Sequence, residues 1–275
     1  MKIRIPLFIL LALFLNSCDQ KQKKVDTPDP KAPQQVSHLK EEELMLQKMY
    51  QKIVAYHSDG NDIPVDSLET VNEKFQTAFL NSLTKNPESI RYPFDSLKKE
   101  NIDIVISSDS LFKIYSWNTW EGGTMLDFMN LFQYQSGTKV KAKLSEDTNP
   151  ESDDDYIPFY SELFTLKNGT KTYYLAVSNG VYSSKDVSQS IEVFTIENGE
   201  LKKETKLFKT KEGFVKELRI DFDFFSVVDR PERPLKLIKY DDQKKQIYLP
   251  VVTNDGSVTK DFTVYTFTGQ YFEVK

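Results

Sequence analysis

The chain has 275 residues, and 41 acidic against 36 basic side chains give a net charge of −5. The two signs are interspersed, so the sequence lacks the basic face that nucleic-acid binding requires, and no nucleic-acid partner is expected. Phe, Tyr and Trp make up 13% of the residues, and such side chains favour β-strands. The composition therefore predicts a mainly β protein with a sizeable core.

The first eighteen residues have the features of an export signal. Met1–Arg4 is basic, and residues 5–15 form an apolar run too short to span a bilayer. The tetrapeptide LNSC, which ends at Cys18, resembles the lipobox of bacterial lipoproteins. That resemblance implies that a signal peptide of residues 1–17 is removed and that Cys18 carries fatty acyl chains such as palmitate. The alternative is an ordinary secreted protein in which the cysteine occurs by chance.

A lipidated Cys18 would determine where in the cell the protein is located. Two or three acyl chains hold a protein on a membrane far more firmly than one, so the membrane is an expected partner through this anchor. We expect a protein of the cell envelope, located on the outer membrane. The sequence does not decide between the periplasmic and the surface-facing leaflet. Cys18 is the only cysteine, so no disulfide is expected.

A polar segment and two helices follow the anchor. Residues 18–36 are rich in Lys, Gln and Pro and read as a disordered tether. Apolar residues at helical spacing predict one helix over 37–58 and a second that opens at Asp66 and ends before Pro87. The two helices form a predicted hairpin over residues 37–88, whose apolar faces need a partner surface.

The remainder, residues 100–275, reads as one antiparallel β domain. Leu218, Ile220 and Phe222 alternate with charged residues, as expected for a strand with one buried face. Asn198-Gly199 between two apolar runs is a strong hairpin signal, and Asn179-Gly180 has the same composition. Strands are expected at 102–106, 111–117, 124–134, 171–177, 191–197, 200–208, 217–224, 235–240, 246–252, 261–267 and 270–274.

So many strands cannot form one flat sheet. Turn chemistry rather than helices separates most of them, which predicts a large antiparallel meander arranged as a sandwich or a curled sheet. A small propeller-like arrangement is the alternative, although no repeat of about 40–50 residues is found. The β region also resembles, in style alone, uncharacterised lipoproteins from Bacteroidota, and this likeness implies no activity.

The stretch from 115 to 125 contains both tryptophans and is the candidate ligand site. Trp117 and Trp120 could stack on sugar rings, while Asn118 and Glu121 could hydrogen-bond sugar hydroxyls. The alternative is that both indoles fill the core beside a Gly-Gly turn.

Catalytic and metal-binding motifs are scarce. His38 and His57 are the only histidines and lie about five helical turns apart, too far to share one zinc ion. The acidic segment 146–155 is rich in oxygen ligands but lacks the glycine and spacing of a calcium loop. No metal and no cofactor is therefore predicted. A glycosidase needs only two carboxylates at the right separation, and no pair can be chosen from sequence.

Three Asp-Ser-Leu tripeptides, with serines at Ser67, Ser96 and Ser110, resemble the O-glycosylation signal of exported Bacteroidota proteins. Each also fits a helix cap or a turn. Together the features predict a lipid-anchored envelope protein that acts as a binding or interaction module, with a glycan or another envelope protein as partner. The alternative is an envelope glycan hydrolase that uses a carboxylate pair.

Overall fold

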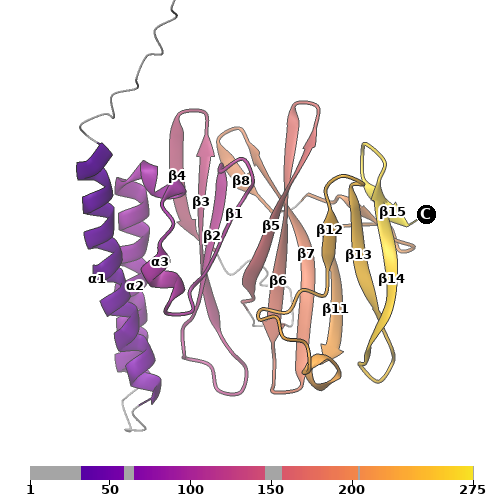
Figure 1. Cartoon of the computed structure of the whole chain (residues 1–275), viewed down its shortest axis with the longest axis horizontal. Coiled ribbons are helices and arrows are strands. Elements are labelled where there is room, and N and C mark those ends of the chain that lie inside the picture. Colours follow the sequence, from indigo (N-terminus) through magenta and orange to yellow (C-terminus); the bar gives the residue numbers. More distant parts are fainter. Residues whose placement is uncertain (1–31, 59–64, 146–156, 204, 275) are drawn as a thin grey trace, which may run out of the picture.

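The computed structural model describes residues 32–58, 65–145, 157–203 and 205–274. A helical hairpin and three largely antiparallel sheets lie side by side as four successive layers (Figure 1). Three apolar cores fill the spaces between these layers. The predicted mainly β fold with an N-terminal helical hairpin is thus confirmed.

The helical hairpin is formed by α1 (Ala32–Ser58) and α2 (Val65–Lys85). The residues that face the first sheet recur at helical spacing, as the sequence indicates: Leu46, Tyr50, Ile53, Phe75, Phe79 and Leu83. The start of the first helix differs from the prediction, because α1 begins at Ala32 rather than at residue 37. The predicted tether of 18–36 therefore includes the first five residues of a helix.

The first sheet has the strand order β1-β2-β3-β4. Its strands are β1 (Asp103–Ile106), β2 (Phe112–Asn118), β3 (Phe128–Ser136) and β4 (Lys139–Leu144). The short helices η1 (Pro87–Arg91) and α3 (Asp95–Lys98) connect α2 to β1. Almost every residue of β2 is buried, because the helical hairpin covers one face of this strand and the second sheet covers the other.

The second sheet has the strand order β11-β7-β6-β5, with β8 paired to the far end of β7. Its strands are β5 (Phe159–Asn168), β6 (Lys171–Val181), β7 (Asp186–Glu197), β8 (Glu200–Lys202) and β11 (Glu217–Asp223). Asn198-Gly199 forms the predicted two-residue hairpin, with both residues at positive φ and Glu197 opposite Glu200. On β11, Leu218, Ile220 and Phe222 are buried as predicted.

The third sheet has the strand order β10-β9-β15-β14-β13-β12 and contains one parallel pair, β15 with β9. Its strands are β9 (Phe208–Lys209), β10 (Phe214–Val215), β12 (Lys239–Asp241), β13 (Gln246–Val252), β14 (Val258–Phe267) and β15 (Phe272–Val274). The 3₁₀-helix η2 (Phe224–Val227) directly follows β11. The sheets stack in a row rather than around a ring (Figure 1), which favours the sandwich over the propeller.

Three strands escaped prediction, namely β4, β5 and the two-residue β10, and one predicted turn is a strand. β4 is a short edge strand in which lysines alternate with small apolar residues, and a register shift between Tyr160 and Glu162 disturbs the alternation of β5. Asn179-Gly180 lies inside β6 rather than in a turn. A Cβ atom at Gly180 would collide with the Ser188 and Tyr182 side chains, so close packing rather than chain reversal requires this glycine.

Candidate binding cleft

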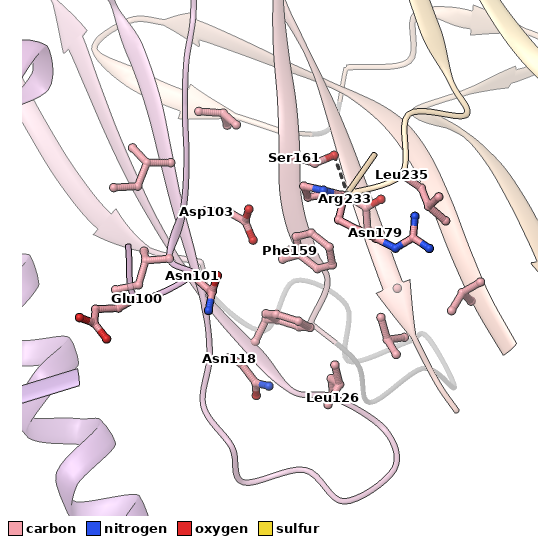
Figure 2. A pocket seen from close by; sticks show the side chains of 18 of the residues that line it. Glu100, Asn101, Asp103, Asn118, Leu126, Phe159, Ser161, Asn179, Arg233 and Leu235 are labelled. Carbon is pink, nitrogen blue, oxygen red and sulfur yellow. Dashed lines mark hydrogen bonds between the residues drawn. The ribbon is translucent and has the colours of Figure 1, made fainter. Parts of the chain in front are cut away.

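A cleft of about 810 Å³ opens where the ends of the first two sheets meet. Its walls come from segments far apart in sequence: α1, the end of α3 and the residues after it, β1, the ends of β2 and β3, the ends of β5, β6, β7 and β11, the start of η2, and the loop at 233–235. This volume is within the range of small-molecule sites. Figure 2 shows the side chains that line it.

Aromatic rings form much of the inner wall. Tyr50 from α1, Trp120 after β2, Phe128 at the start of β3 and Phe159 at the start of β5 all line the cleft. The Phe128 and Phe159 ring centroids are 4.8 Å apart. These rings come from three layers of the fold, so the cleft depends on the helical hairpin as well as on the sheets.

Asn118 holds the Trp120 side of the wall in place. Its Oδ1 accepts a hydrogen bond of 2.8 Å from the Trp120 backbone N–H, and Trp120 has a φ of 61°. An Asn side chain that bonds the backbone two residues ahead is an Asx-turn, which here stabilises the left-handed backbone of Trp120. The Tyr50 hydroxyl donates to the Asn118 carbonyl oxygen over 3.2 Å, which ties α1 to the same corner.

The Asp103 carboxylate is turned toward the middle of the cleft (Figure 2). Among the described residues, no hydrogen-bond donor and no cation pairs with this carboxylate. Burial alone raises the pKa of Asp103 from 3.8 to about 6, since burial disfavours the charged form. Asp103 shares its face of β1 with Val105, which packs against the core between the first two sheets.

Glu100 is the second acid in the lining, but it is engaged elsewhere. Its Oε1 accepts hydrogen bonds from Gln47 Nε2 at 2.7 Å and Gln51 Nε2 at 2.8 Å, both on α1. Figure 2 shows its carboxylate directed away from the cavity. Asp103 and Glu100 therefore do not face a common space, as the two acids of a glycosidase must.

The segment that leads into the cleft is positioned by Glu43. This buried α1 carboxylate accepts hydrogen bonds from the backbone N–H groups of Ser96 and Leu97, and from the Tyr92 hydroxyl at 2.9 Å. These amides belong to the first turn of α3, where free N–H groups need an acceptor. The chain then runs directly from α3 into the cleft lining at Glu100 and Asp103.

The opposite wall is a hydrogen-bonded polar network. Asn179 donates to the Ser161 hydroxyl at 2.8 Å, and its Oδ1 accepts a hydrogen bond of 2.8 Å from Gln189. Arg233 donates three hydrogen bonds to backbone carbonyl oxygens of its own loop, and its guanidinium lies 5.3 Å from the centre of the Phe224 ring. This wall is therefore ordered before any ligand arrives.

The four predicted glycan-binding residues are separated by the fold. Trp120 and Asn118 line the cleft. Trp117 is 0% exposed and packs between Phe75 and Phe79, so its ring has no open face and the sugar-stacking prediction is wrong for it. Glu121 is outside the cleft lining and accepts a hydrogen bond of 3.0 Å from Asn72. The alternation of β2 sends Trp117 into the helical layer, whereas Trp120 lies beyond the strand's end.

The predicted modification sites also differ in access. Ser96 is buried, and its hydroxyl accepts a hydrogen bond of 2.6 Å from Lys40, so the folded chain does not offer it to an enzyme. Ser67 is half-buried in the first turns of α2, and Ser110 is half-buried in the turn before β2. Cys18 and the acidic segment 146–155 lie outside the described residues.

Sequence reasoning missed the residues that complete the cleft, among them Asp103, Phe159 and Asn179. One signal was present, because Asp103 is a single acid next to the apolar residues Ile102 and Ile104. An acid in such a run points to a buried charge. Asn179 could not be identified, since its neighbour Gly180 made the pair look like a turn.

Within the part of the chain that the structure describes, no group of three or more His, Cys, Asp or Glu side chains is placed to hold a metal ion. None of the described helices has the length and apolarity needed to cross a membrane. Comparison with family models, with curated proteins and with solved structures finds no match to this chain.

Proposed function

We propose that this chain is a lipid-anchored protein of the cell envelope that binds a saccharide in the cleft between its first two sheets. The observation that carries the proposal is the meeting of aromatic rings and hydrogen-bonding side chains in one cleft of about 810 Å³. Sugar rings stack on aromatic faces through their C–H groups and use their hydroxyls to hydrogen-bond polar side chains.

The orientation of the two carboxylates in the lining favours binding over hydrolysis. Asp103 faces the cleft, while Glu100 is held by Gln47 and Gln51 on the helical side. Hydrolysis of a glycosidic bond needs one acid to protonate the leaving oxygen and a second to act as base or nucleophile. Among the described residues, Asp103 is the one acid whose carboxylate faces the cleft and could take either role.

The binding proposal is tested by calorimetric titration of the soluble protein, residues 32–275, with monosaccharides and short oligosaccharides of bacterial envelopes. Trp120→Ala should weaken saccharide binding at least tenfold, because one stacking face is lost. The control is Phe214→Ala, which removes an exposed aromatic ring from the third sheet. Equal affinity in the parent and in Trp120→Ala, or no saccharide binding by the parent, would contradict the proposal.

The anchor is tested separately in cells. Cys18→Ser removes the thiol that accepts lipid, so incorporation of labelled palmitate should be lost and the protein should leave the membrane fraction. Ser17→Ala, which keeps the thiol, is the matched control. Equal label in Cys18→Ser and the parent would overturn the lipoprotein assignment and leave the cleft proposal untouched.

A further inference from the structure

The Asp103 carboxylate lines the cleft and has no partner among the residues that the structure describes. No described donor lies within hydrogen-bonding distance, and no described Lys, Arg or His lies within ion-pair distance. Figure 2 shows it among the side chains that line the cleft, with no dashed line to any of them. The Asp103 side chain is half-buried, so its carboxylate loses part of its hydration without a partner to replace it, and a cation that enters the cleft would offset that loss.

The cations of the lining do not serve this purpose. Lys98 lines the cleft, but its Nζ lies 3.8 Å from a carboxylate oxygen of Asp95, a residue that does not line it. Arg233 is held by three backbone carbonyls of its own loop. The Lys99 side chain is exposed. Burial is the sole cause of the raised pKa of Asp103, with no contribution from a nearby cation. The counter-charge of Asp103 is therefore absent from the described chain.

The walls beside Asp103 also suit a cation. Tyr50, Trp120, Phe128 and Phe159 line the same cleft, and aromatic faces attract ammonium groups through their negative quadrupole. Ser161 accepts the Asn179 hydrogen bond and keeps its own O–H to donate to a ligand. A carboxylate, aromatic faces and a free hydroxyl donor match a molecule that has both an ammonium group and hydroxyls.

We propose that the ligand of this cleft is an amino sugar with a free, protonated amine, whose ammonium group pairs with the Asp103 carboxylate. The saccharide part of this inference rests on the proposed function, whereas the ion pair rests on Asp103 itself. An N-acetylated sugar has the same ring but no charge, so it leaves Asp103 unpaired. The cleft should therefore discriminate between the two by their charge.

The test uses three probes at pH 7 in calorimetric titrations: methyl glucosaminide, methyl N-acetylglucosaminide and 1,6-diaminohexane. The parent should bind the free amino sugar at least tenfold more tightly than its acetylated counterpart. Asp103→Asn keeps the shape of the side chain and should abolish that preference. Asp261→Asn, an exposed acid on β14, should retain it. Raising the salt concentration should weaken binding of the amino sugar to the parent and should not affect the acetylated sugar.

Each outcome separates the two proposals. Equal affinity for both sugars, or an unchanged preference in Asp103→Asn, overturns the ion pair and leaves saccharide binding standing. Binding of 1,6-diaminohexane alone, lost in Asp103→Asn, supports the ion pair and overturns the saccharide. Binding of none of the three probes overturns the inference. If Asp103→Asn fails to fold in a thermal melt, the salt dependence of the parent decides.

Discussion

Gln189 on β7 donates a 2.8 Å hydrogen bond from Nε2 to Oδ1 of Asn179 on β6, and through it fixes one wall of the cleft. The same Nε2 donates to the Leu235 carbonyl oxygen at 2.8 Å. Its Oε1 accepts from the backbone N–H groups of Leu237 and Ile238 at 3.1 and 2.7 Å. A single buried amide thus joins the second sheet to the loop that closes the cleft.

Gln189→Leu should therefore destabilise the protein by about 3–5 kcal/mol, because it leaves two buried backbone N–H groups and one carbonyl without partners. It should also weaken saccharide binding, since Asn179 and Leu235 lose their common support. Denaturant unfolding measures the first effect and titration the second. Gln243→Leu, at an exposed turn position, is the control and should change stability by less than about 0.5 kcal/mol. A near-parental unfolding midpoint for Gln189→Leu would contradict the role assigned to it.

Asp103 should make the protein less stable as the pH rises. The unfolded carboxyl ionises near 3.8, whereas the folded one holds its proton until the pH approaches about 6. The folded state binds more protons in this window, so unfolding free energy falls between pH 4 and 6 and the loss is complete above it. Asp103→Asn should therefore be more stable than the parent by at most about 3 kcal/mol at pH 7, and little more stable at pH 4.

The measurement for Asp103 is a pair of urea titrations at pH 4 and pH 7 for the parent, Asp103→Asn and the control Asp261→Asn. Of the two variants, only Asp103→Asn should have a higher unfolding free energy than the parent at pH 7. A parental stability curve that rises across this window relative to the Asn variant would show that the carboxylate has a partner.

Lys113 should produce the opposite trend at higher pH. Its side chain is buried beneath η1 and the residues after it, its Nζ donates to the Tyr92 carbonyl oxygen, and Nζ lies 4.9 Å from the centre of the Phe94 ring. Burial, with a smaller contribution from Lys98, lowers the pKa of Lys113 from 10.5 to about 7. The unfolded state holds more protons between these values, so unfolding free energy should rise from pH 7 toward pH 10.

Lys113→Met should remove that rise, because the thioether side chain has a similar length and no charge. Near pH 7 we expect the variant to be more stable than the parent by about 1–4 kcal/mol, and the difference should shrink toward pH 10. The exposed Lys139→Met on β4 serves as the control. Parallel stability profiles of the parent and Lys113→Met would show that the buried amine keeps its ordinary proton affinity.

Phe222→Asp should cost about 3–5 kcal/mol, since Phe222 is 6% exposed in the core between the second and third sheets and the variant buries an unpaired charge there. Asp221→Ala, on the exposed face of the same strand, should change stability by less than about 1 kcal/mol. Thermal melts of the two variants check the pair. Similar melting temperatures would mean that β11 presents its other face to the core.

The sequence by itself determined the local elements of this protein. The apolar spacing of α1 and α2, the alternation from Leu218 to Phe222 and the turn at Asn198-Gly199 each depend on residues a few positions apart, and each is present in the fold. These features follow from helix and strand periodicity and from the backbone freedom of the turn residues, which act within short segments.

Only the tertiary structure decided the cleft. Trp117 and Trp120 are three residues apart, yet the helical layer buries one and the end of the sheet leaves the other in the lining. Asp103, Phe159 and Asn179 meet there from three different strands. Which face of a strand is covered depends on how whole layers stack, and that depends on contacts between residues far apart in sequence. Local periodicity does not contain those contacts, so the fold class could be predicted from the sequence, whereas only Asn118 and Trp120 of the cleft could.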